Sequence, residues 1–455
     1  MNAVVQAETL NSWLERFDRR EMETEPEWLR SLRNDAFARF CQAGFPTTKD
    51  EDWRFTNVQA ISRTAFDTAP DPRDTISTKE LQRFLIPGVS CRLVFVNGRF
   101  APALSQTTGL PSETEVGSLA QALAARAESS EQLGRYASYE QDSFVALNTA
   151  FFEDGAYIHI PPKTVLESPI HLLYLSLPGD RPAMAHTRNL IVVDAGSQVC
   201  VLEDYVSLDD NVFFSNVVTE LVAAEGSVVS LYRIQRESLS TYSISTLHIH
   251  QDRDAHVTSH SLLLGGALVR NNVHPVLAGE GAECLVNGLF VGKGRQHVDN
   301  YMLVEHASPH CSSRQFYNGV LDDEAHGVFH GRIIVHKDAQ KTDAKQTNRN
   351  LLLSDNARID SKPQLEIYAD DVKCTHGATI GQVEEDALFY LRSRGIDEVS
   401  ARHLMLFAFA SECLQRMREL PVREHLQQVV QLWLPSGLAP VNLAIAPETP
   451  SEKVV

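Results

Sequence analysis

The stretch NLIVVDAGSQVCVLEDY, residues 189–205, joins two β-rich runs through an acidic, glycine-containing turn and leaves no room for a helix between them. The same arrangement returns in NVVTELVAAEGSVVSLYRI, residues 216–234. Runs rich in valine, isoleucine and tyrosine, bounded by glycine and acidic residues, are typical of β-strands. The two stretches therefore predict a unit of strand, turn and strand that repeats along the chain.

A short turn signal, an acidic residue or glycine followed by a small residue, recurs through the middle of the chain. It reads DAGS at 194–197, AEGS at 224–227, RDA at 253–255, EGA at 280–282, KDA at 337–339 and DNA at 355–357. The first four signals are about 27–30 residues apart and the later ones are closer. Such a repeat favours a solenoid whose coils stack in parallel and bury an inner row of side chains. We expect a mainly β fold with a right-handed parallel β-helix core flanked by helical N- and C-terminal domains, and a β-sandwich is the alternative.

On either side of this region the pattern changes. Before it, apolar residues recur at helical spacing, DEDWRFTN at 50–57 is expected to form a loop, and CRLVFVNG at 91–98 a strand ending in an Asn-Gly turn. We expect three parts: a helical or mixed α+β region at 1–160, the β-helix at 161–383, and a helical domain at 384–455.

The last part should contain three helices. Gly395 is placed to end the first of them in a left-handed conformation, and Asp397 can cap the second. The second helix is expected to run to Pro421, because proline interrupts a helix.

Composition limits the possible partners and compartments. Lys and Arg number 41 and Asp and Glu 59, so the net charge is 41 − 59 = −18, which argues against nucleic acid or an anionic membrane as a partner. The seven cysteines are scattered, odd in number and without a CxxC motif, which predicts a reducing compartment. No targeting segment is apparent and no apolar run approaches the roughly 18 residues of a membrane span. We therefore expect a cytoplasmic protein.

Near the C-terminal end, ADDVKCTHGATIGQV at 369–383 brings a cysteine and a histidine together in a predicted strand. Alternate residues of a strand share a face, so Cys374 and His376 lie on the apolar face with Ile380. That face is either the interior of the solenoid or a subunit interface. The two residues are then either core residues or ligands of a zinc or iron–sulfur site. Two ligands make an incomplete site, so a second chain would supply the others.

Other histidines also cluster, at His248 and His250, at His256 and His260, and at His326 and His330. A cupin-like metal centre is conceivable, but a histidine-rich β surface explains the pattern better. VGKGRQH at 291–297 lacks the P-loop pattern, so the chain should have no ATP site of its own, and no GxSxG, HExxH or GxGxxG motif occurs. These absences predict a protein that is not an enzyme by itself.

The segment HLMLFAFASECLQRM, residues 403–417, is apolar nearly all round between Leu404 and Ala410. Such a helix is either fully buried or docked on a partner. The candidate docking residues are Arg402, Leu404, Leu406, Phe407 and Phe409.

Three stretches, DEDWRFTN at 50–57, KCTHGATIG at 373–381 and EDALFYLRSRGI at 385–396, resemble the SufB/SufD family of iron–sulfur cluster assembly proteins. The similarity runs in patches from about Asp50 to Met417. The SufB type carries a Glu directly after the matching histidine and a Cys upstream. Here Gly377 follows His376, and LLLSDNARID at 351–360 has no Cys, so the chain resembles the SufD type.

The resemblance implies a parallel β-helix that pairs with SufB and docks the ATPase SufC through its C-terminal helices, at Arg402, Leu404, Leu406, Phe407 and Phe409. It implies a transient iron–sulfur cluster shared with SufB, with Cys374 and His376 as candidate ligands, and transfer to apoprotein acceptors. Reduced flavin is conceivable at the level of the complex, and a homodimer when the chain is isolated. The alternatives are a homodimeric scaffold acting alone and a β-helix enzyme acting on polysaccharides.

Overall fold

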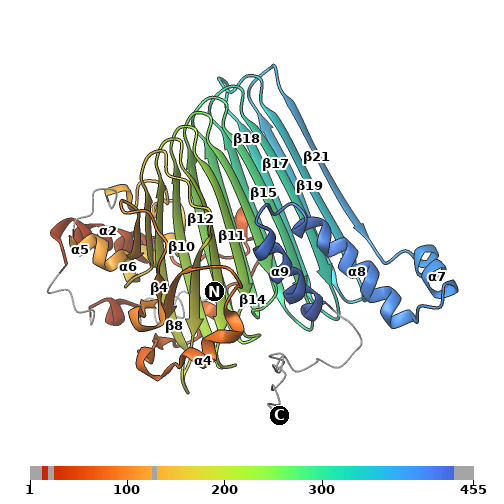
Figure 1. Ribbon diagram of the computed structural model, residues 1–455, viewed down its shortest axis with the longest axis horizontal. Coiled ribbons are helices and arrows are strands. Elements are labelled where there is room, and N and C mark those ends of the chain that lie inside the picture. The colour runs from red at the N-terminus through yellow and green to blue at the C-terminus, as the bar shows by residue number, and fades with distance from the viewer. Residues whose placement is uncertain (1–12, 19–24, 126–130, 435–455) are drawn as a thin grey trace, which may run out of the picture. The chain divides into compact units, whose positions relative to one another are not determined.

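Figure 1 shows the computed structural model, which describes residues 13–18, 25–125 and 131–434. The chain forms two compact units, residues 1–382 and 383–455, and each is described by itself. The outermost parts of the predicted terminal domains, residues 1–12 and 435–455, lie outside the described residues. Among the helices that the structure describes, none is both long and apolar enough to cross a membrane.

The first unit begins with short helices and strands. The helices are α2 (Glu27–Ala43), η1 (Glu51–Trp53), α3 (Gln59–Arg63), η2 (Arg73–Thr75), α4 (Thr78–Leu81), η3 (Gln82–Phe84), η4 (Pro102–Leu104), α5 (Leu119–Ala125) and α6 (Ser143–Phe151), and the strands are β1 (Asp67–Thr68), β2 (Cys91–Val96), β3 (Arg99–Phe100), β4 (Gln106–Thr107) and β5 (Glu115–Ser118). The predicted Asn-Gly turn after β2 is confirmed, because Asn97 and Gly98 both have positive φ and β2 pairs antiparallel with β3. Strand β2 also pairs in parallel with β7 (Ile170–Ser176), so this segment contributes to the main sheets.

The rest of the unit is a parallel β-solenoid of eight turns, β6/β7 to β20/β21, each of which gives one strand to each of two sheets. The further strands are β6 (Ala156–Ile160), β8 (Ala183–Val193), β9 (Gln198–Ser207), β10 (Phe213–Ala223), β11 (Val228–Arg236), β12 (Thr241–Gln251), β13 (His256–Leu263), β14 (Leu268–Leu277), β15 (Glu283–Gly292), β16 (His297–His306), β17 (Ser312–Leu321), β18 (His326–Val335), β19 (Asp343–Leu352), β20 (Arg358–Ile367) and β21 (Lys373–Gly381). From β6 onward, even-numbered strands form one sheet and odd-numbered strands the other, and neighbours within each sheet pair in parallel. Of the first five strands, β1 and β5 join the even-numbered sheet and β2, β3 and β4 the odd-numbered sheet. The predicted parallel β-helix is therefore confirmed, and the sandwich alternative is wrong.

The recurring turn signal marks one end of the coils. The turns there place a residue with positive φ in each coil except the last, at Lys163, Gly196, Gly226, Asp254, Gly281, His310 and Lys341. Each of these residues donates its backbone N–H to a carbonyl in the corresponding turn of the next coil, as Gly196 does to Glu225 at 2.9 Å. The signal at 355–357 lies instead between β19 and β20, at the opposite end of the coils. The last two signals are closer together in the sequence because one lies at each end of the same coil.

The interior of the solenoid is mostly apolar, as predicted, but it also holds a buried ion pair. The core contains the inward-facing valine, leucine and isoleucine residues of successive coils. Among them, the carboxylate of Glu203 accepts hydrogen bonds from Arg233 at 2.8 Å, from Thr219 at 2.7 Å and from Asn189 at 3.2 Å. Glu203 is fully buried and Arg233 is 3% exposed. Each charge therefore depends on the other for compensation.

The segment predicted as a loop at 50–57 packs on the outer face of the even-numbered sheet and contains the short helix η1. The guanidinium of Arg270 lies 3.8 Å from the centroid of the Trp53 ring. The hydroxyl of Thr56 donates to Asp299 and also contacts His297 at 2.8 Å. These contacts fix the N-terminal part of the unit on strands β14 and β16.

His186, on β8, is buried among the rings of Trp13, Phe151 and Phe214. Burial lowers its pKa from 6.5 to about 3, so the folded chain holds it neutral. Between those pH values the unfolded chain binds more protons, and this histidine makes the free energy of unfolding fall as pH falls, by up to about 1.4 kcal/mol per pH unit. We expect His186→Phe to flatten that slope by the same amount in urea unfolding at pH 7, 6 and 5. Equal slopes for the variant and the wild type would contradict the assignment.

The second unit contains α7 (Glu385–Ser393), α8 (Glu398–Leu414) and α9 (Leu420–Trp433). Gly395, with φ of 88°, follows the end of α7, and the Asp397 side chain accepts from the Ser400 N–H at 3.0 Å, so both predicted signals are confirmed. The prediction that the second helix runs to Pro421 is wrong, because α8 ends at Leu414 and Pro421 lies in the first turn of α9. Proline suits that position because its missing N–H would have no partner there.

Candidate functional site

Cys374 and His376 lie on β21, the last strand of the odd-numbered sheet. The register places Cys374 beside Ala344 and His376 beside Gln346, so both side chains continue inward-facing rows of the preceding coils. No further coil follows β21 in the sheet. Cys374 is consequently half-buried against the core and His376 is exposed. In this chain His376 is therefore not a buried core residue, although its row is an interior one.

Within the described residues of the first unit, no coil follows the last one, so this end of the solenoid is unpaired. Strands β20 and β21 are the terminal strands of their sheets, and Figure 1 shows β21 at the far edge. Large apolar side chains are exposed on and beside them: Ile367 at 39%, Tyr368 at 63% and Ile380 at 53%. An unpaired strand edge with exposed apolar residues can pair with another chain. The Cys374 and His376 pair thus lies on a surface suited to an interface.

The surroundings of Cys374 favour the protonated thiol. Partial burial raises the pKa of the Cys374 thiol, a backbone N–H at Ala344 opposes that shift, and the nearby Asp343 carboxylate adds to it. The thiolate is the form that binds metals. A bound metal ion or a nearby cation would therefore have to lower the pKa of the Cys374 thiol so that it loses its proton. Within residues 13–18, 25–125 and 131–434, no three His, Cys, Asp or Glu side chains are grouped so that they could hold a metal ion. On its own the pair offers two ligands at most.

Two glutamines lie in the same interior row as His376, and sequence reasoning did not single them out. Gln315 on β17 pairs in register with Gln346 on β19, which pairs with His376. The spacings of 31 and 30 residues follow the coil length, so the repeat itself is the signal that could have revealed them. Polar side chains therefore continue from His376 on the last strand into the interior of the preceding coils.

The other histidines that the sequence singled out lie on the outward-facing sides of their strands, but His260 and His330 are only 2% and 3% exposed, so the predicted histidine-rich surface is formed only in part. His248 and His250 both lie on β12, where the His248 ring is 4.8 Å from that of His274 and the His250 ring stacks on Tyr136. His256 contacts Glu283 at 3.0 Å, while His260, like His256, lies on β13. His326 contacts Asp360 at 2.7 Å and His330 contacts Gln364 at 2.6 Å. The imidazoles are distributed over several strands and do not converge on one centre among the described residues.

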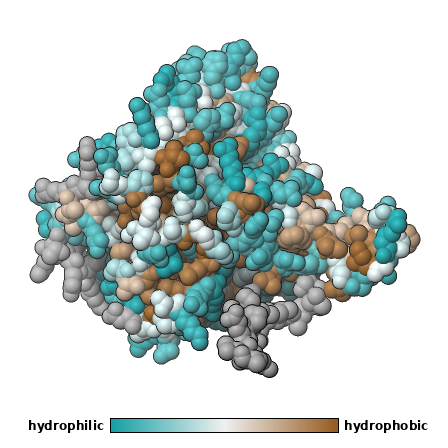
Figure 2. Space-filling view, viewed as in Figure 1, coloured by the Kyte–Doolittle hydropathy of each residue, from teal (hydrophilic) through white to brown (hydrophobic). Residues whose placement is uncertain are grey.

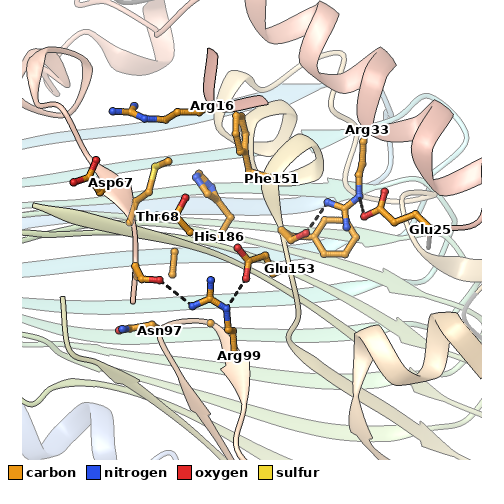
Figure 3. Close-up of a pocket in the computed structure, with 15 residues that line it drawn as sticks. Arg16, Glu25, Arg33, Asp67, Thr68, Asn97, Arg99, Phe151, Glu153 and His186 are labelled. Carbon is orange, nitrogen blue, oxygen red and sulfur yellow. Dashed lines mark hydrogen bonds and ion pairs between the residues drawn. The ribbon is translucent and has the colours of Figure 1, made fainter. Parts of the chain in front are cut away.

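A cavity of about 630 Å³ lies between the N-terminal segment and β8, far along the solenoid from β21. Figure 3 shows two of its three arginines engaged by the protein: Arg99 pairs with Glu153 at 2.6 Å, and Arg33 pairs with Glu25 at 3.1 Å. His186 lines the cavity as a neutral imidazole. None of the residues that line the cavity belongs to the cysteine and histidine pair on β21.

In the C-terminal unit the predicted docking residues do not all reach the surface. Arg402 and Leu404 are exposed, Phe407 and Phe409 are half-buried, and Leu406 is only 3% exposed. Of the two alternatives, burial or docking, Leu406 therefore follows the first, and it is not available as a docking residue. Additional apolar surface comes from α7, where Phe389 is 73% and Tyr390 57% exposed, and apolar side chains gather over this helix in Figure 2. Sequence reasoning missed these two residues.

Comparison with known proteins covers nearly the whole chain. Residues 176–409 match the SufBD core domain of the SUF system for iron–sulfur cluster assembly, and residues 9–172 match the SufBD protein N-terminal region. An iron–sulfur cluster assembly SufBD family protein of Synechocystis is 36% identical over 90% of this chain and 91% of its own length. The SufD proteins of Escherichia coli and Bacillus subtilis are 29% and 26% identical, over 94% and 90% of this chain and 97% and 94% of their own lengths.

Proposed function

The chain belongs to the SufBD family of the SUF system for iron–sulfur cluster assembly, and from that premise we propose that it is a SufD-type scaffold subunit without enzymatic activity of its own. It pairs with a SufB-type subunit, docks a SufC-type ATPase, and contributes Cys374 and His376 to a nascent cluster that passes to apoproteins in the cytoplasm. The cluster is cargo rather than a resident cofactor.

The observation that carries the proposal is the position of Cys374 and His376 on the uncovered last strand. A second chain that pairs with β20 and β21 would bury the exposed Tyr368 and Ile380 and extend both sheets. It would also place its own side chains beside a thiol and an imidazole, which are ligands suited to iron–sulfur clusters. A two-ligand half-site is what such a shared site needs from one partner.

The division of labour follows from what the sequence lacks. The chain has no P-loop, so ATP would be bound and hydrolysed by the docked ATPase. The exposed Phe389, Tyr390 and Leu404 of the C-terminal unit offer the apolar contact for that subunit. Reduced flavin belongs to the proposal only at the level of the complex, because the chain has no GxGxxG motif.

Co-expression with SufB- and SufC-type subunits, followed by purification through a tag on this chain, tests the proposal. We expect recovery of both subunits and, after anaerobic supply of iron and sulfide, cluster absorbance in the complex. Recovery of a colourless homodimer with neither subunit would favour the homodimeric scaffold. Recovery of a colourless single chain would contradict both.

The ATPase contact has its own prediction. Arg402→Glu and Leu404→Glu reverse or introduce charge at exposed positions of α8, and each should weaken ATPase capture about tenfold, which corresponds to roughly 1.4 kcal/mol. The matched control is Leu239→Glu, at a leucine that is 50% exposed in the first unit. Titration of the ATPase against tagged chain measures the effect. Capture that survives removal of residues 383–455 would show that the surface lies elsewhere.

A further inference from the structure

The interior row that ends at His376 is an array of polar side chains in register. Gln315, Gln346 and His376 occupy equivalent inward-facing positions on β17, β19 and β21. Neighbouring strands of a sheet are about 4.8 Å apart, so the side chains of adjacent members can reach each other. The first contact is formed: the Gln346 Nε2 donates to the Gln315 Oε1 at 2.8 Å.

In this contact the Gln346 nitrogen donates, and the side-chain oxygen of Gln346 has no hydrogen-bond donor among the described residues. Gln346 is 2% exposed, and its Oε1 is buried without a hydrogen-bond partner among the described residues. A carboxamide is planar, with its oxygen and nitrogen about 120° apart, so a nitrogen directed at Gln315 turns the oxygen away from β17. A buried acceptor of this kind is costly unless a donor reaches it.

Gly331 leaves the space that the Gln346 amide occupies. A Cβ atom at Gly331 would lie 2.0 Å from the Gln346 Nε2, so any side chain there would displace the amide. The pocket for Gln346 is thus formed by the absence of a side chain on the facing strand β18.

On the open side of Gln346 the register places His376 next in the row, while on the other side Gln315, whose Nε2 is also buried without a hydrogen-bond partner among the described residues, already contacts the Gln346 nitrogen. In the isolated chain its imidazole is exposed and water can satisfy its N–H. A subunit that covers β21 excludes that water, and both the imidazole N–H and the Gln346 Oε1 then need a partner.

We propose that Gln346 is a positioning residue whose side-chain oxygen accepts the ring N–H of His376 when a partner subunit covers β21, and so directs the other ring nitrogen outward to the cluster. This rests on the proposed function for the cluster, but the contact itself does not require iron. A neutral imidazole has one donor and one acceptor nitrogen, so fixing the donor fixes which nitrogen can bind metal. Metal-binding histidines commonly have their second nitrogen held in this way.

A double-mutant cycle on partner affinity without iron tests the contact. Gln346→Leu should weaken binding of the SufB-type subunit in the wild-type background, and the loss should be about two- to tenfold smaller when His376→Ala is already present. Gln346→Glu retains an acceptor for His376 and, with the Gln315 amide rotated so that its nitrogen donates to the new carboxylate, should restore the coupling, which a purely packing role would not do. Lys345→Met, on the exposed outward face of the same strand, is the control and should show no coupling to His376.

Thermal unfolding of each single variant verifies that it is folded, and cluster absorbance in the reconstituted complex provides the second readout. Gln346→Leu should reduce cluster yield and Gln346→Glu should recover it. Additive effects on affinity, or a Gln346→Glu variant that behaves as Gln346→Leu does, would overturn the assignment of Gln346. Coupling that is present while His376→Ala still forms clusters would support the contact and refute the proposed cluster role of His376.

Discussion

His376→Ala is expected to give a folded chain that still joins its complex but forms no iron–sulfur cluster. Because the imidazole is exposed on the last strand, its removal leaves no cavity in the core. Substitutions at such positions usually change the free energy of unfolding by less than about 0.5 kcal/mol. Alanine can neither bind iron nor move a proton near pH 7, whereas imidazole can do both. The loss should therefore be close to complete in cluster absorbance and small in melting temperature.

Cys374→Ser is the companion variant, and it separates the thiolate from the imidazole. Serine keeps the approximate size of the side chain but lacks the affinity of sulfur for soft metals. Since Cys374 is half-buried against the core, a modest fall in melting temperature is expected here and not for His376→Ala. Complex recovery, melting temperature and cluster absorbance should be measured for both. A His376→Ala protein that is destabilised and still builds clusters would return both residues to a structural role.

The fold could be predicted because one physical requirement repeats. All coils but the last have a tight turn with a residue at positive φ, and glycine occupies that position at 196, 226 and 281. The repeat was harder to follow further on because His310 and Lys341 adopt the same conformation without the residue type that announces it. Variable coil length blurs the period further, so the number of turns could not be read from the sequence.

The candidate site could be predicted only in part, for a different reason. Alternation along β21 correctly placed Cys374 and His376 on one face, because that periodicity is a local property of a strand. Whether the face is buried depends on whether another chain or segment covers the last coil. The change to a helical pattern after residue 383 predicted that the β-helix ends there, but alternation within the strand does not report whether its inward face is covered. Gln346 was missed for a related reason, since its relation to His376 appears only once the register between β19 and β21 is known.

Glu203→Ala is expected to lower the free energy of unfolding by about 3–5 kcal/mol, because it leaves the guanidinium of Arg233 without its countercharge inside the solenoid. The guanidinium lies 2.7 Å from the carboxylate and is 3% exposed, so water cannot replace the lost partner without opening the coil. Thr219 and Asn189 lose an acceptor at the same time.

Chemical denaturation followed by the circular dichroism of the β-sheet measures this effect, and Glu225→Ala is the matched control. Glu225 pairs with Arg253 at the surface, where the two side chains are 55% and 60% exposed, so water can solvate the arginine left behind and little change is expected. The double variant Glu203→Leu with Arg233→Met should recover much of the loss, because removing both charges removes the uncompensated one. If Glu203→Ala has the same free energy of unfolding as the control, the charge of Arg233 is compensated by other groups. The stability of the solenoid would then come from its apolar rows and not from this ion pair.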